Sequence, residues 1–489
     1  MPVLPVVDTH PPRRPAETTV NALVFLTLFL GLVDGRQMVE LAAAEETQRV
    51  EVHLDGELQA TIYGGPPWKA PVSLGEELAP HRLEAVARDA EGRELGRAEQ
   101  WLNLPRARAE VSLLVDAGAP GEASVEIGWK AVEQEEAESL RLELDGVPVP
   151  VGKWEGSSTR VALPPHDPGA LHVVTAEVVF PGPITARADV AFGAPYGDEV
   201  ATELTGLPVE VDGRRRLRRA EDAGPWLRVG DEALRVVAVD EGEVDLFAVM
   251  DAGAHPQLDL LAVRLGQRLR ARQGPVQRQG PNVGGGLLAS SPLRQTGMRD
   301  GDRLYLVRPQ VESAVGTTHL FGISPPLDDN RGGSAWQLAA FRLDPFEGVP
   351  QRLAEAVATA GMRATGASRP RGLVLVLGPE AEDASRLTPE RVRGYLGRLG
   401  VPLTVLYVDL LTEDEAERRG GLEEARRRWG PGVADVANAD DWLREFSDLR
   451  ARLGHQRVLW VEGRHLPHEV SLVGAPDWLR RVAGTAGER

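Results

Sequence analysis

The stretch Val244-Asp-Leu-Phe-Ala-Val-Met-Asp-Ala-Gly-Ala-His-Pro256 decides the fold of the second half of this chain. Its apolar run over residues 246–250 predicts a buried strand that closes on Asp251. A helix is expected to start at Pro256, because proline suits the first helical turn. Its apolar face would consist of Leu258, Leu261, Leu265 and Leu269. Open α/β sheets bind ligands at such strand ends, so a site is expected around Asp251.

Beyond this stretch, strands continue to alternate with helices, which is the pattern of a parallel sheet. Further strands are expected at 303–307, 318–323, 373–377, 403–408 and 457–461. Residues 244–489 are therefore predicted to form one doubly wound α/β domain.

Three helices in this half carry recognisable end signals. One has Thr388 as N-cap, Pro389 at its first position and Gly400 past its end. Thr412 and Glu415 indicate a capping box for the next helix. A third helix is expected over 440–453, with its apolar residues facing inward.

The half before residue 196 contains an internal repeat of short strands. Arg49-Val-Glu-Val-His-Leu-Asp-Gly56 corresponds to Ser139-Leu-Arg-Leu-Glu-Leu-Asp-Gly146, and His81 corresponds to His172. The spacing is roughly 90 residues, which predicts two tandem all-β units. The two histidines could form a paired site, but a packing or turn role is the favoured interpretation.

The order of these motifs resembles that of bacterial immunoglobulin-like modules: a strand with an Asp-Gly turn, a proline-bearing segment, then a strand of the form Leu-x-Ala-Val-Ala-x-Asp. The resemblance implies immunoglobulin-like β-sandwiches at 18–105 and 106–195, which present a binding surface and carry no catalytic centre. Residues 1–17 are predicted to be disordered. Residues 196–243 are predicted to be a connector with strands.

Composition limits the class of function. The chain has 489 residues, a length that suggests about three domains. A net charge of -18 disfavours nucleic acid and anionic membranes as partners. The absence of cysteine excludes disulfides, thiolate zinc sites and cysteine nucleophiles. The apolar run 20–33 is interpreted as part of a hairpin turning on Asp34-Gly35, the alternative being a processed or anchoring segment.

Residues 244–489 resemble the von Willebrand factor type A domain, in the variant found behind immunoglobulin-like modules in secreted bacterial proteins. The first strand with Asp251 carries the likeness. So do Arg371-Gly-Leu-Val-Leu-Val-Leu-Gly-Pro-Glu-Ala-Glu-Asp-Ala-Ser385 and the strand after Gly400, together with the last helix and strand over 441–460. The resemblance implies a periplasmic or extracellular location, although the N-terminus gives no clear signal peptide.

The same resemblance implies a divalent-cation site formed by an Asp-x-Ser-x-Ser loop, a Thr and a second Asp. Asp251 matches the first position, but Gly253 and His255 replace the two serines. The second and third loops read Gly348-Val349-Pro350 and Leu377-Gly378-Pro379. One carboxylate does not hold magnesium or calcium, so a decayed site without metal is expected.

Four further motifs were considered as sites. The basic run 213–219 favours a solvated loop, with docking to an acidic partner as the alternative. Gly284-Gly-Gly286 lacks the context of a phosphate loop, and 328–332 lacks the spacing of an EF-hand. His465 and His468 could be a metal pair, but Pro467 breaks the helical geometry and no third ligand is evident.

These observations predict a non-enzymatic protein-binding or scaffold protein with a protein partner, no nucleic acid and no cofactor. We expect no catalytic residue, and membrane association stays open. The first alternative is a metal-dependent adhesion or sensing module that uses Glu380, Glu382 or Asp383. The second alternative is an enzyme with an unrecognised site in the α/β domain.

Overall fold

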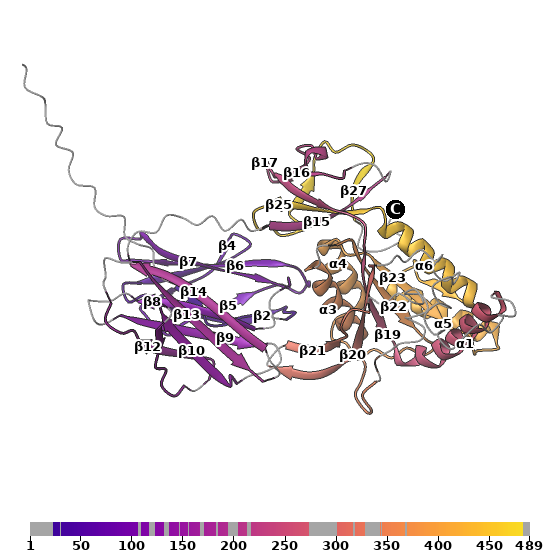
Figure 1. Ribbon diagram of the computed structural model, residues 1–489, viewed down its shortest axis with the longest axis horizontal. Helices are drawn as coiled ribbons and strands as arrows, with labels where there is room; N and C mark the ends of the chain where they lie inside the picture. The colour runs from indigo at the N-terminus through magenta and orange to yellow at the C-terminus, as the bar shows by residue number, and fades with distance from the viewer. Residues whose placement is uncertain are drawn as a thin grey trace, which may run out of the picture.

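The described strands form seven β-sheets, which fall into four groups (Figure 1). The computed structural model describes residues 23–29, 31–105, 109–116, 123–131, 136–145, 147–154, 156–166, 171–181, 184–193, 204–212, 217–272, 301–315, 318–327, 343, 345–366 and 369–482. The expectations for residues 1–17, 284–286 and 328–332 lie outside these ranges.

The first sandwich pairs a three-stranded sheet with a four-stranded one. The first sheet contains β1 (Leu23–Phe25), β2 (Arg36–Ala43) and β5 (Trp68–Ser73). The second contains β4 (Glu57–Tyr63), β3 (Arg49–Leu54), β6 (His81–Arg88) and β7 (Glu94–Leu102). Every second residue of β5 is buried between the sheets, as alternation requires. The described part of the 20–33 run thus includes a strand, which pairs antiparallel with β2.

The second sandwich again pairs a four-stranded sheet with a three-stranded one, further along the chain. One sheet contains β11 (Val147–Val149), β10 (Ser139–Leu144), β13 (Leu171–Phe180) and β14 (Ile184–Gly193). The other contains β12 (Ser158–Ala162), β9 (Ser124–Ala131) and β8 (Ala109–Asp116). The predicted repeat holds in the pairing: β3 pairs with β6 in the first sandwich as β10 pairs with β13 in the second.

A third β unit joins the segment expected to be a connector to the end of the chain. One sheet contains β18 (Val236–Asp240), β25 (Gln456–Glu462), β15 (Leu204–Val211) and β27 (Leu479–Arg481). The other contains β17 (Glu232–Ala233), β16 (Leu227–Val229) and β26 (Val470–Leu472). In Figure 1 this unit stands above the junction between the sandwiches and the helices.

This unit corrects the expectation for strand 457–461. That strand, β25, belongs to the third β unit and not to the parallel sheet, since it pairs antiparallel with β15 and with β18. Gly206 permits the pairing, because a side chain there would press on the Trp460 ring, only 3.1 Å away. An apolar run predicts a buried strand but not the sheet that it joins. The α/β unit is consequently inserted between the two halves of the third β unit.

The inserted unit is a six-stranded sheet covered by helices on both faces. Its order is β21 (Thr318–Ile323), β20 (Arg303–Val315), β19 (Asp245–Met250), β22 (Arg371–Leu377), β23 (Leu403–Val408) and β24 (Ala434–Val436). Pairing is parallel from β20 to β24 and antiparallel only at β21. All six residues of β19 are buried, as expected for a strand covered on both faces.

Helices flank the parallel sheet in two groups. Residues from α3 (Leu353–Thr365), α4 (Pro389–Leu399) and α5 (Glu415–Trp429) share one core with the sheet. Residues from α1 (His255–Arg272) and α6 (Ala439–Leu453) share the other. Leu258, Leu261 and Leu265 are buried as predicted, and the side chain of Leu269 lies outside the described set.

The helix ends agree with the sequence at α4 and differ at α5. Thr388 accepts a hydrogen bond from the Arg391 N–H, and Gly400 is left-handed with φ of 65°. At α5 the expected Thr412 cap is wrong. Asp414 caps this helix by accepting from the N–H groups of Ala416 and Glu417, and the helix begins at Glu415, which leaves Thr412 two residues before the cap.

The first sandwich is docked on α4 through a buried contact. The Tyr395 hydroxyl donates to the Asn103 carbonyl oxygen at 2.6 Å. Arg391 pairs with Asp34 at 2.9 Å, and Arg398 donates to the Leu78 carbonyl at 2.9 Å. Leu78 itself is buried in the same core as α3 and α4. The sandwich and the α/β unit therefore share packed interior.

Candidate functional site

Asp251 ends β19 at the carboxyl edge of the parallel sheet, where the sequence placed a site. Its side chain is fully buried. One carboxylate oxygen accepts from the Gln351 side-chain amide at 2.9 Å, and the other from the Gly378 N–H at 3.1 Å. Burial raises the pKa of Asp251, while these hydrogen bonds work in the opposite direction. Both oxygens are thus engaged by protein groups.

The loops around Asp251 pack directly against one another. A Cβ on Gly378 would lie 2.3 Å from the Gly253 carbonyl carbon, so only glycine allows this approach. A Cβ on Gly253 would lie 2.8 Å from the Asp251 carboxylate. His255 opens α1 on the far side of this turn. The two positions that would carry serines in the cation-binding pattern therefore form a tight backbone junction and a helix start.

Gln351 is the residue at this site that sequence reasoning missed. It follows Gly348-Val349-Pro350, the loop where a threonine ligand was sought. Besides donating to Asp251, its side-chain oxygen accepts from the Ala252 N–H at 2.8 Å, and its carbonyl accepts from the Ala384 N–H at 2.7 Å. One glutamine therefore joins three loops at the strand ends. Its distance of 100 residues from Asp251 in sequence leaves no local signal.

The acidic loop after β22 divides into a structural residue and two exposed ones. Asp383 accepts from the Leu353 N–H at 2.9 Å and from the Ala354 N–H at 3.3 Å, and so caps the start of α3. Glu380 and Glu382 are exposed. Of the three carboxylates proposed as substitute metal ligands, one is thus engaged by the start of α3 and the other two are exposed to solvent.

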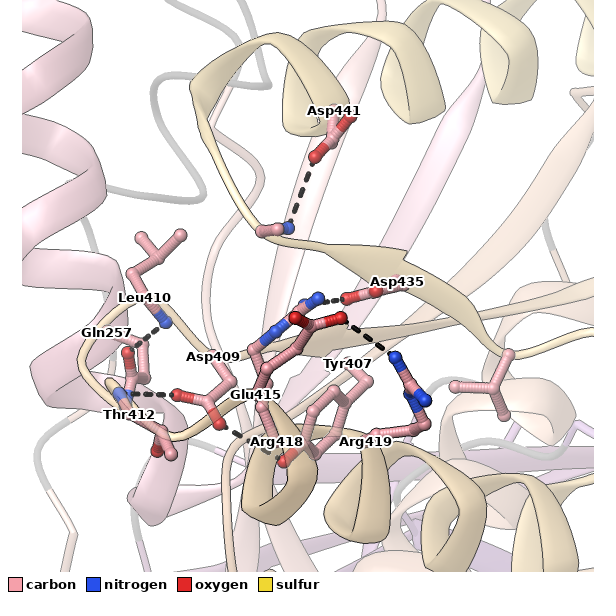
Figure 2. Close-up of polar contacts among 12 residues, drawn as sticks. Gln257, Tyr407, Asp409, Leu410, Thr412, Glu415, Arg418, Arg419, Asp435 and Asp441 are labelled. Carbon is pink, nitrogen blue, oxygen red and sulfur yellow. Dashed lines mark hydrogen bonds and ion pairs between the residues drawn. The ribbon is translucent and has the colours of Figure 1, made fainter.

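A second buried carboxylate, Asp409, follows β23 at the same edge (Figure 2). It accepts from the Thr412 N–H at 3.1 Å and from the Tyr407 hydroxyl at 3.4 Å. The next residue, Leu410, donates its N–H to the Gln257 side chain at 2.6 Å. Burial, and then the charge of Asp409, raise the pKa of Tyr407. These contacts fix the loop that presents Leu411, which is 51% exposed.

The donor set at these strand ends does not fit a divalent cation. Each Asp251 oxygen already accepts a hydrogen bond from a protein N–H group. Within the described ranges, no group of three or more His, Asp or Glu side chains could hold a metal ion. What the arrangement does chemically is to hold three loops in fixed positions beneath an exposed rim.

The two repeat histidines each complete a turn and do not meet. His81 Nδ1 lies 2.7 Å from Asp55, and Asp55 also accepts from the Arg82 N–H at 2.8 Å. His172 pairs with Asp145 in the same way at 2.7 Å. Both aspartates have a φ of 51° in the turn. We call each arrangement a His–Asp clasp, and it matches the turn role that the sequence favoured.

The His465 and His468 pair is not a shared site in this fold. His465 Nε2 lies 3.0 Å from the Glu462 carbonyl, whereas His468 faces the first sandwich through its electrostatic contacts with Asp55 and His81. Of the basic run 213–219, Arg218 and Arg219 lie in the described part and are exposed. Their N–H groups both donate to Asp222.

A small pocket, open to solvent, lies between the third β unit and the end of α4. Its walls are mostly apolar and include Leu207, Leu227, Leu399, Pro467, Val470 and Arg481. Arg481 is the one titratable residue among its lining residues, so the cavity supplies no acid–base pair.

Comparisons with known proteins return distant likenesses. No family model matches the chain, and no curated protein matches it. Among solved structures, it is similar to the fibronectin(III)-like modules of Clostridium thermocellum CbhA, with 16% identity and a TM-score of 0.15 over 16% of this chain and 92% of that one. It is also similar to the human COPII-coat protein Sec24c, with 10% identity and a TM-score of 0.22 over 46% and 40%.

A third likeness is to part of a 1.5-MDa bacterial ice-binding adhesin. Identity is 9% and the TM-score 0.14, over 40% of this chain and 70% of that one. The paired antiparallel sheets, rather than these likenesses, identify the β-sandwiches here. Among the described helices, none is both long enough and apolar enough to cross a membrane.

Proposed function

We propose that this protein is a non-enzymatic scaffold that binds another protein without a metal ion. In this proposal the sandwiches are immunoglobulin-like, and the inserted unit is a von Willebrand A-type domain whose cation site has been replaced by protein contacts. The observation that carries it is the Gln351 amide, which donates to the buried Asp251 carboxylate at 2.9 Å. A fixed donor there satisfies a charge that a cation would otherwise neutralise.

The exposed rim above this contact supports a role in binding. Glu380, Glu382 and Leu411 are exposed on loops that follow neighbouring strands of the sheet. The loops beneath them are held by Gln351 and Asp409 through partly buried hydrogen bonds. Because these loops are already held in place, binding of a partner would cost little conformational entropy. We call Glu380, Glu382 and Leu411 the strand-end rim.

Calorimetric titration of the full chain with magnesium, calcium and manganese tests the metal-independent part. We expect no saturable heat. Micromolar binding that Asp251→Ala abolishes would overturn the proposal. Binding that survives Asp251→Ala but is lost in the Glu380→Ala, Glu382→Ala double variant would overturn it as well, by placing the ion in the loop.

Partner binding is tested with the full chain as bait in envelope fractions of the native host, with and without EDTA. We expect the same protein to be recovered in both, and to be lost with Leu411→Asp. Val263→Asp is the control, because Val263 is similarly exposed, at 55%, but lies on α1. Loss of the partner in EDTA, or failure to recover any protein specifically, would contradict a metal-independent scaffold.

A further inference from the structure

The segment 463–469 of the third β unit lies against the first sandwich. The Arg464 guanidinium stands over the Trp101 ring of β7, 4.9 Å from its centroid. Within the segment, Leu466 is buried, and the Pro467 carbonyl accepts from the Arg481 side chain at 2.9 Å. We call residues 463–469 the docking segment. It brings the C-terminal strands of the third β unit against the first sandwich, although Trp101 and Arg464 lie far apart in the sequence.

Two buried histidine nitrogens face this contact without hydrogen-bond partners among the described residues. They are His468 Nδ1 in the docking segment and His81 Nε2 in β6. The other nitrogen of His81 is held by Asp55 in the clasp. Asp55 in turn has its second oxygen engaged by the Arg82 N–H. The one carboxylate that acts on His468 is therefore already committed to the first sandwich.

The groups around His468 come from four elements and are mostly cationic. Asp55 lies in the turn after β3 and His81 in β6, while Arg398 belongs to α4 and Arg481 to β27. Arg398 is fixed by the Leu78 carbonyl and by Glu77. Within the docking segment, Arg464, His465 and Glu469 are the other ionisable side chains. Burial, and then the two arginines and His81, hold the pKa of His468 below 6.5 against the attraction of Asp55.

We propose that the docking segment is an acid-sensitive latch, released from the first sandwich when His468 takes up a proton. A neutral imidazole leaves one ring nitrogen as an acceptor, whereas the charged ring carries N–H donors at both positions. The added proton comes from solvent, and the charge that it brings is placed beside Arg398 and Arg481. Because His468 Nδ1 has no acceptor in the docked arrangement, the charged ring favours exposure to water.

The direction with pH follows from the sign of the shift. A histidine whose pKa is lower when docked than when exposed stabilises docking at pH values above 6.5, its ordinary value. That stabilisation is lost as the pH falls through the lower docked value. The latch should therefore be closed near pH 7.5 and open progressively as the pH falls below 6.5.

The second sandwich provides an internal control. The His172–Asp145 clasp has the same geometry as His81–Asp55, but its histidine packs against His166 and Phe192 of its own sandwich. Among the described residues, the docking segment interacts electrostatically with the first clasp, through the effect of Asp55 and His81 on His468. If protonation weakened every His–Asp clasp, both sandwiches would change at low pH. Release of the latch would change only the first sandwich and the docking segment.

Hydrogen–deuterium exchange on the full chain at pH 7.5 and pH 5.5, corrected for the intrinsic pH dependence of exchange, tests the latch. In the wild type we expect protection of residues 463–470 to fall several-fold at the lower pH. His468→Gln replaces the imidazole with a neutral amide that takes up no proton. In this variant the protection of residues 463–470 should not change with pH. His172→Gln should respond as the wild type does.

Equal protection at the two pH values in the wild type would overturn the latch, and so would an undiminished pH response in His468→Gln. A matching loss of protection around His172 at pH 5.5 would also overturn it, by indicating general acid unfolding. His468→Asn provides a second neutral variant should the glutamine variant fail to fold, as judged by circular dichroism. None of these outcomes depends on the identity of the protein partner.

Discussion

Gln351 lies in the loop before α3, yet its side-chain amide donates a hydrogen bond to Asp251 and accepts one from the Ala252 N–H. These two residues are 100 and 99 positions away in the sequence. A single amide thereby satisfies a buried carboxylate and a buried N–H at the same time. This relationship makes the strand ends a closed hydrogen-bonded junction. It also explains why the surroundings of Asp251 tolerate Gly253 and His255 where a cation-binding loop would need oxygen ligands.

Gln351→Ala should destabilise the fold without exposing a new cation site. Asp251 would lose its donor and the Ala252 N–H its acceptor, and a buried unsatisfied polar group costs about 1–3 kcal/mol. Urea unfolding of the full chain measures this loss. Gln59→Ala on the exposed side of β4 is the control and should change stability by less than about 0.5 kcal/mol. A neutral Gln351→Ala would show that the junction does not hold the loops.

The buried ion pair at the opposite edge of the sheet should be among the most sensitive positions. Arg450 of α6 donates to Asp302 at 2.8 Å, with side chains 4% and 0% exposed, and Asp302 also accepts from the Val244 N–H at 2.8 Å. Asp302→Ala leaves the guanidinium uncompensated and should cost about 3–5 kcal/mol. Its exposed counterpart is Arg419–Glu415 (Figure 2), where Glu415→Ala should cost no more than about 0.5 kcal/mol. Urea midpoints that rank the two variants in the other order would contradict this account.

Acid should weaken the clasps only at low pH. The hydrogen bond from His172, and then the Val173 N–H, hold the pKa of Asp145 below 3.8. A depressed folded pKa stabilises the fold above 3.8, and that contribution is lost as the pH falls through the lower folded value. Asp145→Asn should therefore flatten the pH dependence of stability below pH 4, with less than about 1 kcal/mol lost at pH 7 for so exposed a group. Unfolding curves between pH 3 and 7 measure both effects; an unchanged acid slope would refute the clasp as its source.

Tyr395→Phe tests whether the first sandwich and the α/β unit unfold together. The lost hydroxyl leaves the Asn103 carbonyl without its 2.6 Å donor in a buried contact. We expect a loss of about 1 kcal/mol and a broadened calorimetric transition, as the first sandwich begins to unfold separately. Tyr63→Phe at a ring that is 71% exposed is the control and should leave the transition unchanged. A variant as stable and as cooperative as the wild type would argue against energetic coupling.

The corrected cap of α5 makes a local prediction. Asp414→Ala removes the acceptor for two N–H groups and should cost about 1 kcal/mol, seen as faster hydrogen exchange in the first turn of α5. Thr412→Ala retains the N–H that binds Asp409, so it should have little effect. The reverse ranking would restore Thr412 as the cap.

The local features of this fold could be predicted because their signals are local. The strand before Asp251, the Thr388 cap and the buried faces of α1 and α6 follow from residues a few positions apart. At α5, two overlapping cap patterns begin at Thr412 and Asp414, and in the structure the helix starts directly after Asp414. The sequence around these two residues does not favour one pattern over the other.

The long-range features could not be predicted in this way. Nothing near Gln351 indicates that it reaches Asp251, and nothing in the apolar run of β25 distinguishes a central parallel strand from an antiparallel partner of β15. The repeat placed the aspartate and the histidine of the two clasps at corresponding positions, 26 and 27 residues apart, but it did not predict that they pair. It gave no sign that the first clasp faces the docking segment.

The pairing of β15 with β25 has a consequence for synthesis of the protein on the ribosome. Thr205 donates to the carbonyl of Gly463, 258 residues later. At about 5–20 residues per second, β15 waits roughly 13–52 s for its partner strand. During that interval its apolar face and one sheet edge are open to other nascent chains. The third β unit can therefore be completed only after the α/β unit inserted between its two halves has been synthesised.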